Sequence, residues 1–481
     1  MQTILILGAG PAGLALAMKL LRRSDLNAEI TVIEQMPWVG GLAASFEYEG
    51  LNFDLGSHRL HPAISFDILQ DLRALMGSEL LDRPRNGRIR LLGQFVKFPF
   101  NLFDFALHLP PSFLVRIGMD AITKLFRWEC KSHASFADVL LDGLGETICN
   151  KFYFPYARKL WGLDPEEIST VQAQRRISTN NMTKIMRKIL VSRFKPEGAG
   201  RFFYPRKGFG QISQRLAQEV EHLGGKIMLS TKVKKIRLQN GHPVSIVVEP
   251  NKNMLDKSHI MSGCEEIFTD FVFSTIPITY LVNCLSGEVP TQVRDSCHHI
   301  RYRAMVFCYL VLETEQFSPY DAHYFPENNT IFSRLSEPKN YSASREPRGI
   351  TGLCAEIPCS LADDIWNASE DEISNRVIKD LAYAGLPVQS SVKTTFVRRL
   401  SEVYPVYDLN FDSRFRVVDD YLSQISGLVS LGRQGLFVHD NTHHTMEMAY
   451  RASECLQRGL VWNSEKWQFY RKHFSKHVVE D

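Results

Sequence analysis

The chain has 481 residues, of which 44% are hydrophobic and 23% are charged, and its formal net charge is +3 at pH 7. This length and composition predict an ordinary globular protein of two or three domains and exclude a disordered or fibrous one. The small positive charge is spread along the chain, so it does not indicate a nucleic-acid partner.

The nine cysteines are scattered and form no C-x-x-C pair. They therefore predict neither a disulfide framework nor a zinc site, and reduced thiols are the better expectation. No H-E-x-x-H motif or carboxylate cluster at ligand spacing occurs either. We expect no metal site from the sequence.

Residues 4–13, ILILGAGPAG, predict the beginning of a dinucleotide-binding domain. An apolar run leads into a glycine-rich turn and then into good helix formers, which indicates strand, turn and helix. Gly8 permits the sharp turn, Gly10 lets the backbone approach a pyrophosphate, and Gly13 lets the helix pack closely on the strand. The next apolar run ends in Glu34, whose carboxylate can accept hydrogen bonds from a ribose diol.

A glycine pair follows soon after the second strand, in Gln35 to Gly41 (QMPWVGG). This loop resembles one in the superfamily of FAD enzymes that includes amine oxidases, protoporphyrinogen oxidases, phytoene desaturases and UDP-galactopyranose mutase. The resemblance implies FAD rather than NAD as the cofactor, with Gly41 and Leu42 beside it. By the same resemblance, the backbone of Val233 meets the adenine.

The segment 427–456 resembles the element of this superfamily that approaches the flavin, and it contains the predicted cofactor contacts Gly432, Arg433, Thr442 and Thr445. A helix beginning near Thr442 would aim its positive dipole end at the flavin pyrimidine ring. Amine oxidases usually carry an acidic residue where this chain has Arg433. The Gly-Arg turn is more similar to the mutase branch.

We predict an α/β fold in which a Rossmann-like FAD-binding domain of the glutathione-reductase type is interleaved with an α+β substrate domain. The FAD-binding domain is expected to comprise residues 1–60, 200–276 and 400–460. Residues 61–199 and 277–399 would form the substrate domain, and 461–481 a C-terminal tail.

Three side chains are candidates for catalysis. His58, in the loop GSHRLHP, resembles a histidine beside the flavin in the mutases, and Arg175 and Arg334 are candidates for binding an anionic group. For the arginines, packing or ordinary surface charge is an open alternative. Arg83 to Arg90 (RPRNGRIR) predict a hairpin at Asn86-Gly87 that either presents arginines to an anion or is a solvated basic hairpin.

No uncharged run of about 18 residues occurs, so no transmembrane segment is expected. The apolar stretch 95–127 permits peripheral membrane contact, although core helices explain such a stretch more often. The nucleotide-binding strand begins almost at the first methionine, which leaves no room for a cleavable leader, and cytoplasmic localisation is the default expectation.

Three functions remain open from the sequence. The leading one is an FAD-dependent oxidoreductase that takes hydride from a small-molecule substrate. The first alternative is a non-redox flavoenzyme of the UDP-galactopyranose mutase type acting on a nucleotide sugar, and the second is a flavin-binding protein without catalysis. The substrate would be an apolar ring compound or a nucleotide sugar, and the sequence indicates no oligomeric state.

Overall fold

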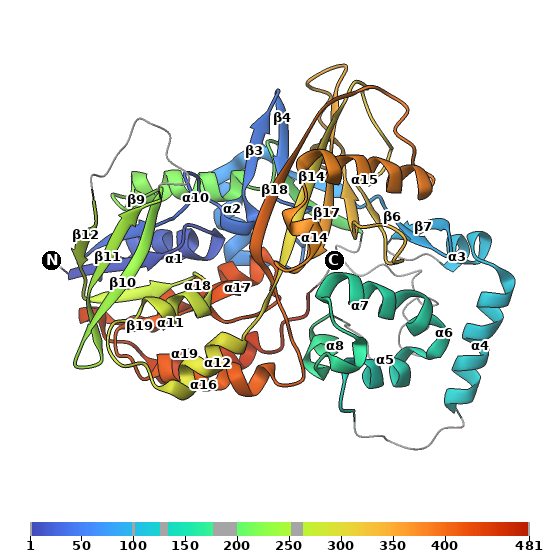
Figure 1. The fold of residues 1–481 in the computed structure, drawn as a ribbon. Helices are drawn as coiled ribbons and strands as arrows, with labels where there is room; N and C mark the ends of the chain where they lie inside the picture. Colours follow the sequence, from blue (N-terminus) through green and yellow to red (C-terminus); the bar gives the residue numbers. More distant parts are fainter. Residues whose placement is uncertain (1, 99–101, 126–132, 177–199, 252–262, 480–481) are drawn as a thin grey trace.

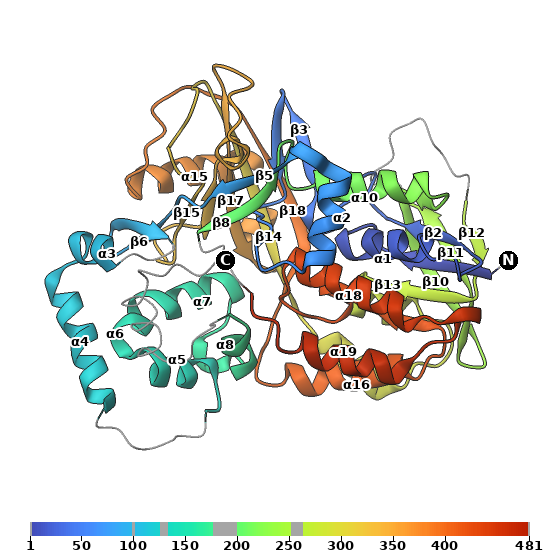
Figure 2. The same cartoon turned by 180° about the vertical axis from the view of Figure 1, so that it is seen from behind.

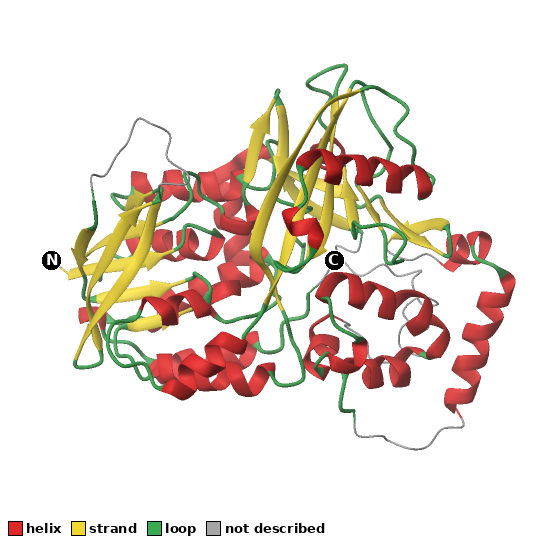
Figure 3. Cartoon of the chain, viewed as in Figure 1, coloured by secondary structure: helices red, strands yellow, loops and turns green. Residues whose placement is uncertain are grey.

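The computed structural model describes residues 2–98, 102–125, 133–176, 200–251 and 263–479, and the chain folds as an α/β protein (Figures 1 and 3). A parallel sheet with its helices forms one part. A mixed sheet and a group of helices form the other part, on the opposite side of the molecule (Figure 2).

The first part is built on sheet A, a parallel sheet of five strands. Their order is β19 (Leu428–Ser430), β13 (Phe271–Ser274), β1 (Gln2–Leu7), β2 (Ala28–Ile33) and β9 (Lys226–Met228). The side chains of β1 point alternately to the two faces, and residues 4–7 are all fully buried. An unbroken apolar run is what a parallel strand covered on both faces requires.

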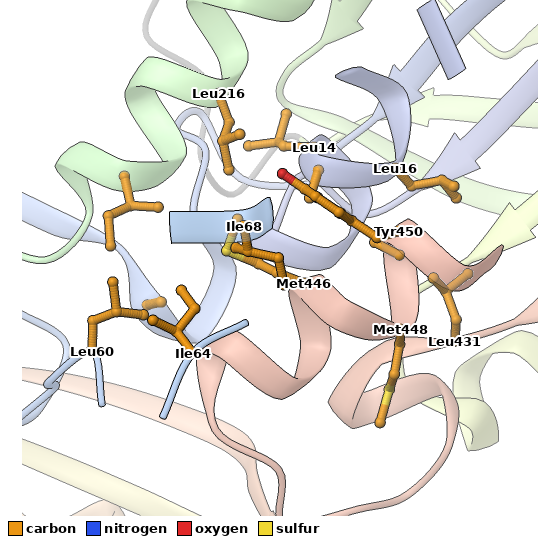
Figure 4. Close-up of a cluster of buried hydrophobic side chains, with 14 of the residues drawn as sticks. Leu14, Leu16, Leu60, Ile64, Ile68, Leu216, Leu431, Met446, Met448 and Tyr450 are labelled. Atoms are coloured by element: carbon orange, nitrogen blue, oxygen red, sulfur yellow. The ribbon is translucent and has the colours of Figure 1, made fainter. Parts of the chain in front are cut away.

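Helices cover one face of sheet A. They are α1 (Pro11–Leu21), α2 (Phe66–Met76), α10 (Gln211–His222), α18 (Thr442–Cys455) and α19 (Ser464–Phe474). Leu14 and Leu16 of α1 meet Met446 and Tyr450 of α18 in this core, as Figure 4 shows. The two helices therefore form a packed pair beside the central strand.

The opposite face of sheet A packs on a small antiparallel sheet and three helices. These are β10 (Thr231–Gln239), β11 (His242–Pro250), β12 (Glu265–Phe268), α11 (Ile278–Cys284), α12 (Thr291–His299) and α16 (Phe411–Ser423). Leu5 and Leu7 of β1 belong to this second core.

The second part contains sheet D, a mixed sheet of seven strands. Their order is β18 (Val392–Pro405), β14 (Tyr302–Leu312), β17 (Thr351–Cys359), β16 (Arg334–Ser336), β15 (Ala322–Tyr324), β6 (Gly87–Leu91) and β7 (Gln94–Phe98). Helix α15 (Glu370–Tyr383) covers one face through Ile373, Val377 and Leu381. The short helices α13 (Pro338–Ser342), α14 (Asp364–Asn367) and α17 (Gly432–Gly435) lie in connections.

Shorter elements complete the structure. Two paired ribbons, β3 (Ser45–Tyr48) with β4 (Leu51–Asp54) and β5 (Leu80–Pro84) with β8 (Arg201–Pro205), lie between the parts (Figures 1 and 2). The remaining helices are α3 (Leu102–His108), α4 (Pro111–Leu125), α5 (Phe136–Leu144), α6 (Glu146–Ile148), α7 (Phe154–Trp161) and α8 (Thr170–Arg176). No helix among the described ranges is long and apolar enough to cross a membrane.

The predicted α/β fold, with a Rossmann-like parallel sheet and a second sheet in the other part, is confirmed. Sheet A takes its strands from the three predicted segments 1–60, 200–276 and 400–460, although the domain division itself stays a prediction. The segment 461–481, expected as a tail, contains α19, which buries Trp467 and Phe474 against the helices of sheet A.

The predicted hairpin at Asn86-Gly87 is wrong. Gly87 begins β6, which pairs with β7 across a turn at Leu92-Gly93. The amide of Asn86 instead donates to Asp321 at 3.1 Å, a residue far away in the sequence. A tertiary hydrogen bond thus holds the dipeptide that the local pattern assigned to a turn.

Candidate functional site

A cavity of about 630 Å³ lies where the two parts meet. Sheet A contributes the loops after β1, β2 and β13, and sheet D contributes residues of β14, β16, β17 and β18. The carboxyl ends of parallel strands are where α/β proteins bind ligands. Eleven of the predicted site residues line the cavity: Gly8, Gly10, Glu34, Gly41, Leu42, His58, Val233, Arg334, Arg433, Thr442 and Thr445.

The glycine loop gives the cavity an open backbone wall. A Cβ atom on Gly10 would meet nothing within 4 Å, because this residue faces the space of the cavity. Gly8 has a φ of +101°, and a Cβ there would lie 2.4 Å from the Thr275 hydroxyl. Gly13 does not line the cavity, but a Cβ on it would lie 2.0 Å from the carbonyl oxygen of Gly8. Gly8 thus serves the turn and Gly13 the helix packing, and Gly10 leaves open space in the cavity wall.

Glu34 lies at the end of β2 and is 7% exposed. Its two carboxylate oxygens accept hydrogen bonds from the amides of Ala9 and Met36, each at 2.9 Å. Burial raises the pKa of this carboxyl, and the amide hydrogen bonds oppose that rise. A carboxylate has about four lone-pair positions. Because Glu34 lines the cavity, the remaining ones are available to a ligand such as a diol.

Val233 lines the cavity from β10, whose first residue, Thr231, donates its amide to the Glu34 carbonyl at 2.8 Å. Its carbonyl oxygen accepts a hydrogen bond from the Tyr280 hydroxyl at 2.6 Å. The strand is irregular between Val233 and Lys235, where its pairing with β11 shifts register. Such a bulge re-aims the backbone at the edge of a site.

The N-terminus of α18 also faces the cavity, where Thr442 and Thr445 line the wall. Asn441 caps this helix, and the His444 side chain accepts from its backbone amide at 3.3 Å. Because α1 begins at the same cavity with Pro11 and Ala12, two helix N-termini point to one space. Their dipoles favour negative charge there.

Gly432 and Arg433 are the first two residues of the short helix α17, which precedes α18 in the chain. Gly432 does not line the cavity: it has a φ of +79°, and a Cβ on it would lie 3.1 Å from Ala12 of α1. The guanidinium of Arg433 does line it, and donates to the carbonyl oxygens of Asp440 at 3.2 Å and Val403 at 3.1 Å. Both of these acceptors are backbone carbonyls, and they hold the guanidinium at the cavity wall.

His58 lines the cavity and stacks on Phe209 with a ring distance of 5.3 Å. Its Nδ1 lies 3.3 Å from the carbonyl oxygen of Gly56, which can only accept. The proton is therefore on Nδ1, and Nε2 is the acceptor. Burial, with the charges of Arg334 and Arg433, lowers the pKa of His58 to about 3. The imidazole is neutral near pH 7.

Arg334 is paired with Glu356, and both line the cavity. The Nε and Nη2 atoms of Arg334 each donate to the carboxylate at 2.7 Å. One Glu356 oxygen also accepts from the amide of Ser57 at 2.7 Å, next to His58. The pair thereby connects the histidine loop to sheet D.

Arg59 is a site residue that the sequence did not indicate as functional. It lines the cavity, pairs with Asp321 at 3.2 Å and donates to the hydroxyls of Tyr324 at 2.8 Å and Tyr341 at 3.2 Å. Its position next to His58 was the available signal. Its partners come from a distant segment, which sequence spacing cannot reveal.

Arg175 does not line the cavity but supports a residue that does. Its Nη1 donates to Asp440 at 3.0 Å, and Asp440 lines the wall beside α18. The second Asp440 oxygen accepts from His477 Nδ1 at 2.7 Å. The amide of Val479, another lining residue, donates to the Arg175 carbonyl at 2.7 Å. Arg175 therefore holds the end of the chain against the cavity.

Cations outnumber carboxylates in the cavity wall. The cationic lining residues are Arg59, Arg85, Arg201, Lys232, Arg334, Arg399 and Arg433, and the acidic ones are Glu34, Glu356, Glu402 and Asp440. Arg399 donates to the backbone carbonyls of Trp366 at 2.8 Å and Ala368 at 2.5 Å. Within the described ranges no carboxylate forms an ion pair with it. The cavity therefore favours anionic ligands.

These residues fit a dinucleotide. The open space over Gly10 and two helix N-termini suit a diphosphate, and the buried carboxylate of Glu34 suits a ribose. Fold and site together define the class: an α/β protein with a Rossmann-like parallel sheet, and a mixed sheet on the other side of a cavity that suits a dinucleotide.

The chain belongs to the family of flavin-containing amine oxidoreductases, whose model matches residues 11–454. The structure is similar to that of reduced UDP-galactopyranose mutase, with a TM-score of 0.79 and 19% identity over 100% of both chains. No curated protein matches the sequence.

Two oxidases have a similar fold. A protein assigned as a protoporphyrinogen oxidase from Exiguobacterium sp. 255-15 gives a TM-score of 0.68 at 18% identity, covering 94% of this chain and 98% of that one. Putrescine oxidase bound to putrescine gives a TM-score of 0.63 at 16% identity, covering 94% and 98%. The predicted resemblance to this superfamily is confirmed, and at these identities the structures share the fold alone.

Proposed function

We propose that the protein is an FAD-dependent oxidoreductase whose substrate is an anionic small molecule. Membership of a family of flavin enzymes supports the cofactor and the reaction class. The excess of cations in the cavity wall carries the choice of substrate. Arg399 adds to it, because its acceptors are two backbone carbonyls and no carboxylate of the described ranges forms an ion pair with it. An amine substrate would bring a further cation into this wall, which is unfavourable.

The cofactor would lie between the glycine loop and α18. Glu34 would accept hydrogen bonds from the ribose, Gly10 would leave room for the diphosphate, and the α18 N-terminus at Thr442 would stabilise negative charge. When bound, the flavin supplies the hydride-accepting chemistry.

The remaining residues would bind and orient the substrate. Arg399 is positioned to bind an anionic group, and neutral His58 offers an acceptor at Nε2. Arg59 is paired with Asp321, so we assign it to the structure of the wall. Arg334 is already neutralised by Glu356, so we assign it to holding the histidine loop rather than to binding the substrate. A substrate held between the two parts would limit the access of water to the reacting atoms.

A second candidate is a non-redox reaction of the mutase type on a nucleotide sugar. The observation that favours it is the likeness to UDP-galactopyranose mutase over the whole length of both chains. A nucleotide sugar carries a diphosphate, so the cationic wall fits this candidate as well.

An anaerobic experiment distinguishes these candidates. The oxidised protein is mixed with a panel of carboxylates and phosphate esters, and with putrescine as a cationic control. We expect an anion, and not putrescine, to bleach the flavin absorbance. The protein is then reduced with dithionite and given UDP-galactopyranose. Furanose formation without net flavin oxidation would instead establish the mutase reaction, and bleaching by putrescine alone would contradict the anionic substrate.

A further inference from the structure

Helix α18 and the segment that follows α19 bring together three metal-ligating side chains outside the cavity. Glu447 lies on α18, His473 lies at the end of α19, and His477 follows it. One ligand atom of each lies within 4.8 Å of the ligand atoms of the other two. The two helices pack side by side, as Figures 1 and 2 show.

The distances suit ligands of one ion. Nε2 of His477 lies 3.7 Å from one Glu447 oxygen, and Nε2 of His473 lies 3.8 Å from the other. Both separations are too long for hydrogen bonds. Ligand atoms about 2.1 Å from a tetrahedral zinc ion lie about 3.4 Å apart, so small side-chain adjustments are sufficient.

His477 carries the independent sign of a ligand. The residue is 8% exposed, and its Nε2 is a buried atom without a hydrogen-bond partner in the described structure. Its Nδ1 lies 2.7 Å from Asp440, so in the neutral imidazole the proton is on Nδ1 and the lone pair is on Nε2, which lies 3.7 Å from Glu447. Histidine ligands of metals characteristically donate the other ring N–H to a carboxylate in this way. Arg175 in turn fixes Asp440.

An alternative group of Asp440, His444 and His477 is also close in space. Arg175 lies 3.0 Å from Asp440, and the hydrogen bond from His477 takes the second oxygen of that carboxylate. A metal ion bound to this carboxylate would lie close to the positive guanidinium of Arg175, which is unfavourable. On the other side of the ring, Nε2 of His477 has no hydrogen-bond partner in the part of the chain that the structure describes, and the His473 ring is perpendicular to it at 5.7 Å.

We propose that Glu447, His473 and His477 form a binding site for one divalent transition-metal ion of the zinc class, with water completing the coordination. Ions of the zinc class bind imidazole and carboxylate ligands together, whereas calcium and magnesium bind oxygen ligands. The His473 side chain is 61% exposed, which gives the ion a path from solvent.

The ion would connect the chain end to the cofactor cavity. The first turn of α18 lines the cavity, and so does Val479, two residues beyond His477. Glu447 lies on α18 and His477 in the segment after α19, so an ion bound to both would hold that segment against α18. This inference is independent of the proposed reaction, because the three ligands lie outside the cavity wall.

Untagged protein, stripped with a chelator, is titrated with Zn²⁺ in competition with a chromophoric indicator, and with Co²⁺ to observe the spectrum of the bound ion. We expect one equivalent of Zn²⁺, with binding weakened more than about 100-fold by His473→Ala and about 10–100-fold by Asp440→Asn. His222→Ala is the matched control, because His222 is 82% exposed beside Glu219 at 4.0 Å and belongs to no group of three ligands among the described residues.

Thermal unfolding separates a metal site from a structural role. We expect stripped wild type and His473→Ala to have the same Tm, and Zn²⁺ to raise the Tm of wild type and of His222→Ala only. The proposal is overturned if stripped wild type binds less than one equivalent. Equal Zn²⁺ affinities of wild type and His473→Ala would overturn it too.

Discussion

Arg334 and Glu356 are directly opposite each other on the neighbouring strands β16 and β17, and their side chains form two parallel hydrogen bonds of 2.7 Å. Glu356 is 2% exposed, so removing the arginine would leave a buried carboxylate without its counter-ion. The pair sits under the His58 loop through the amide of Ser57.

We expect Arg334→Ala to lower the free energy of unfolding by about 3–5 kcal/mol, the usual cost of breaking a buried ion pair by removing one partner. Arg348→Ala is the control, because Arg348 pairs with Glu346 at 3.3 Å on the surface, where the cost is below about 1 kcal/mol. Urea unfolding measures both values. Equal effects of the two substitutions would contradict the role assigned to the pair.

Gly10 and Gly13 belong to the same motif, but their substitutions should differ. A methyl group on Gly10 enters open cavity space, so we expect Gly10→Ala to change stability by at most about 0.5 kcal/mol. It should weaken FAD binding at least about tenfold, which corresponds to about 1.4 kcal/mol. Gly13→Ala places a carbon 2.0 Å from the Gly8 oxygen and should destabilise the fold by about 1–3 kcal/mol. FAD titration and thermal unfolding of both variants test this contrast.

The sequence predicted the parts of the site that depend on local conformation. Gly8, Gly10 and Gly13 are defined by one turn between β1 and α1, and Glu34 by the end of the next strand. Their types and spacing follow from backbone geometry alone, so a single sequence is enough to place them. The confirmed fold rests on the same reasoning.

The substrate side of the cavity depends on tertiary contacts and could not be predicted in this way. Arg59 is fixed by Asp321, and Glu356 reaches Ser57 from sheet D. The Asn86-Gly87 hairpin was wrong for the same reason, since Asp321 binds the Asn86 amide. A local sequence pattern does not encode which distant segment will lie next to a given residue.

Glu34→Gln should weaken FAD binding by about 10–100-fold, because hydrogen bonds to a charged group are worth about 1.5–3 kcal/mol. Both carboxylate oxygens accept backbone amides, from Ala9 and Met36, so the amide group of a glutamine would oppose one of these donors. Glu29→Gln is the matched control, because Glu29 is an exposed residue of the same strand β2. Fluorescence titration with FAD checks the difference. Equal affinities of the two variants would argue against a ribose contact at Glu34.

The stability of the protein should depend on the neutral state of His58. Burial lowers the pKa of His58 from its ordinary value of 6.5 to about 3, so between these values the unfolded chain binds a proton that the folded chain does not. The stabilisation is therefore fully present above pH 6.5 and is lost as the pH falls toward 3. Each pH unit in this window corresponds to at most about 1.4 kcal/mol.

Between pH 6.5 and pH 5 we expect wild type to lose about 1–2 kcal/mol more than His58→Gln, as measured by urea unfolding at each pH. Parallel curves for the two proteins would show that His58 is not held neutral. If it is neutral, an activity pKa between 5 and 8 must come from another group, and His58→Gln should leave that pKa in place.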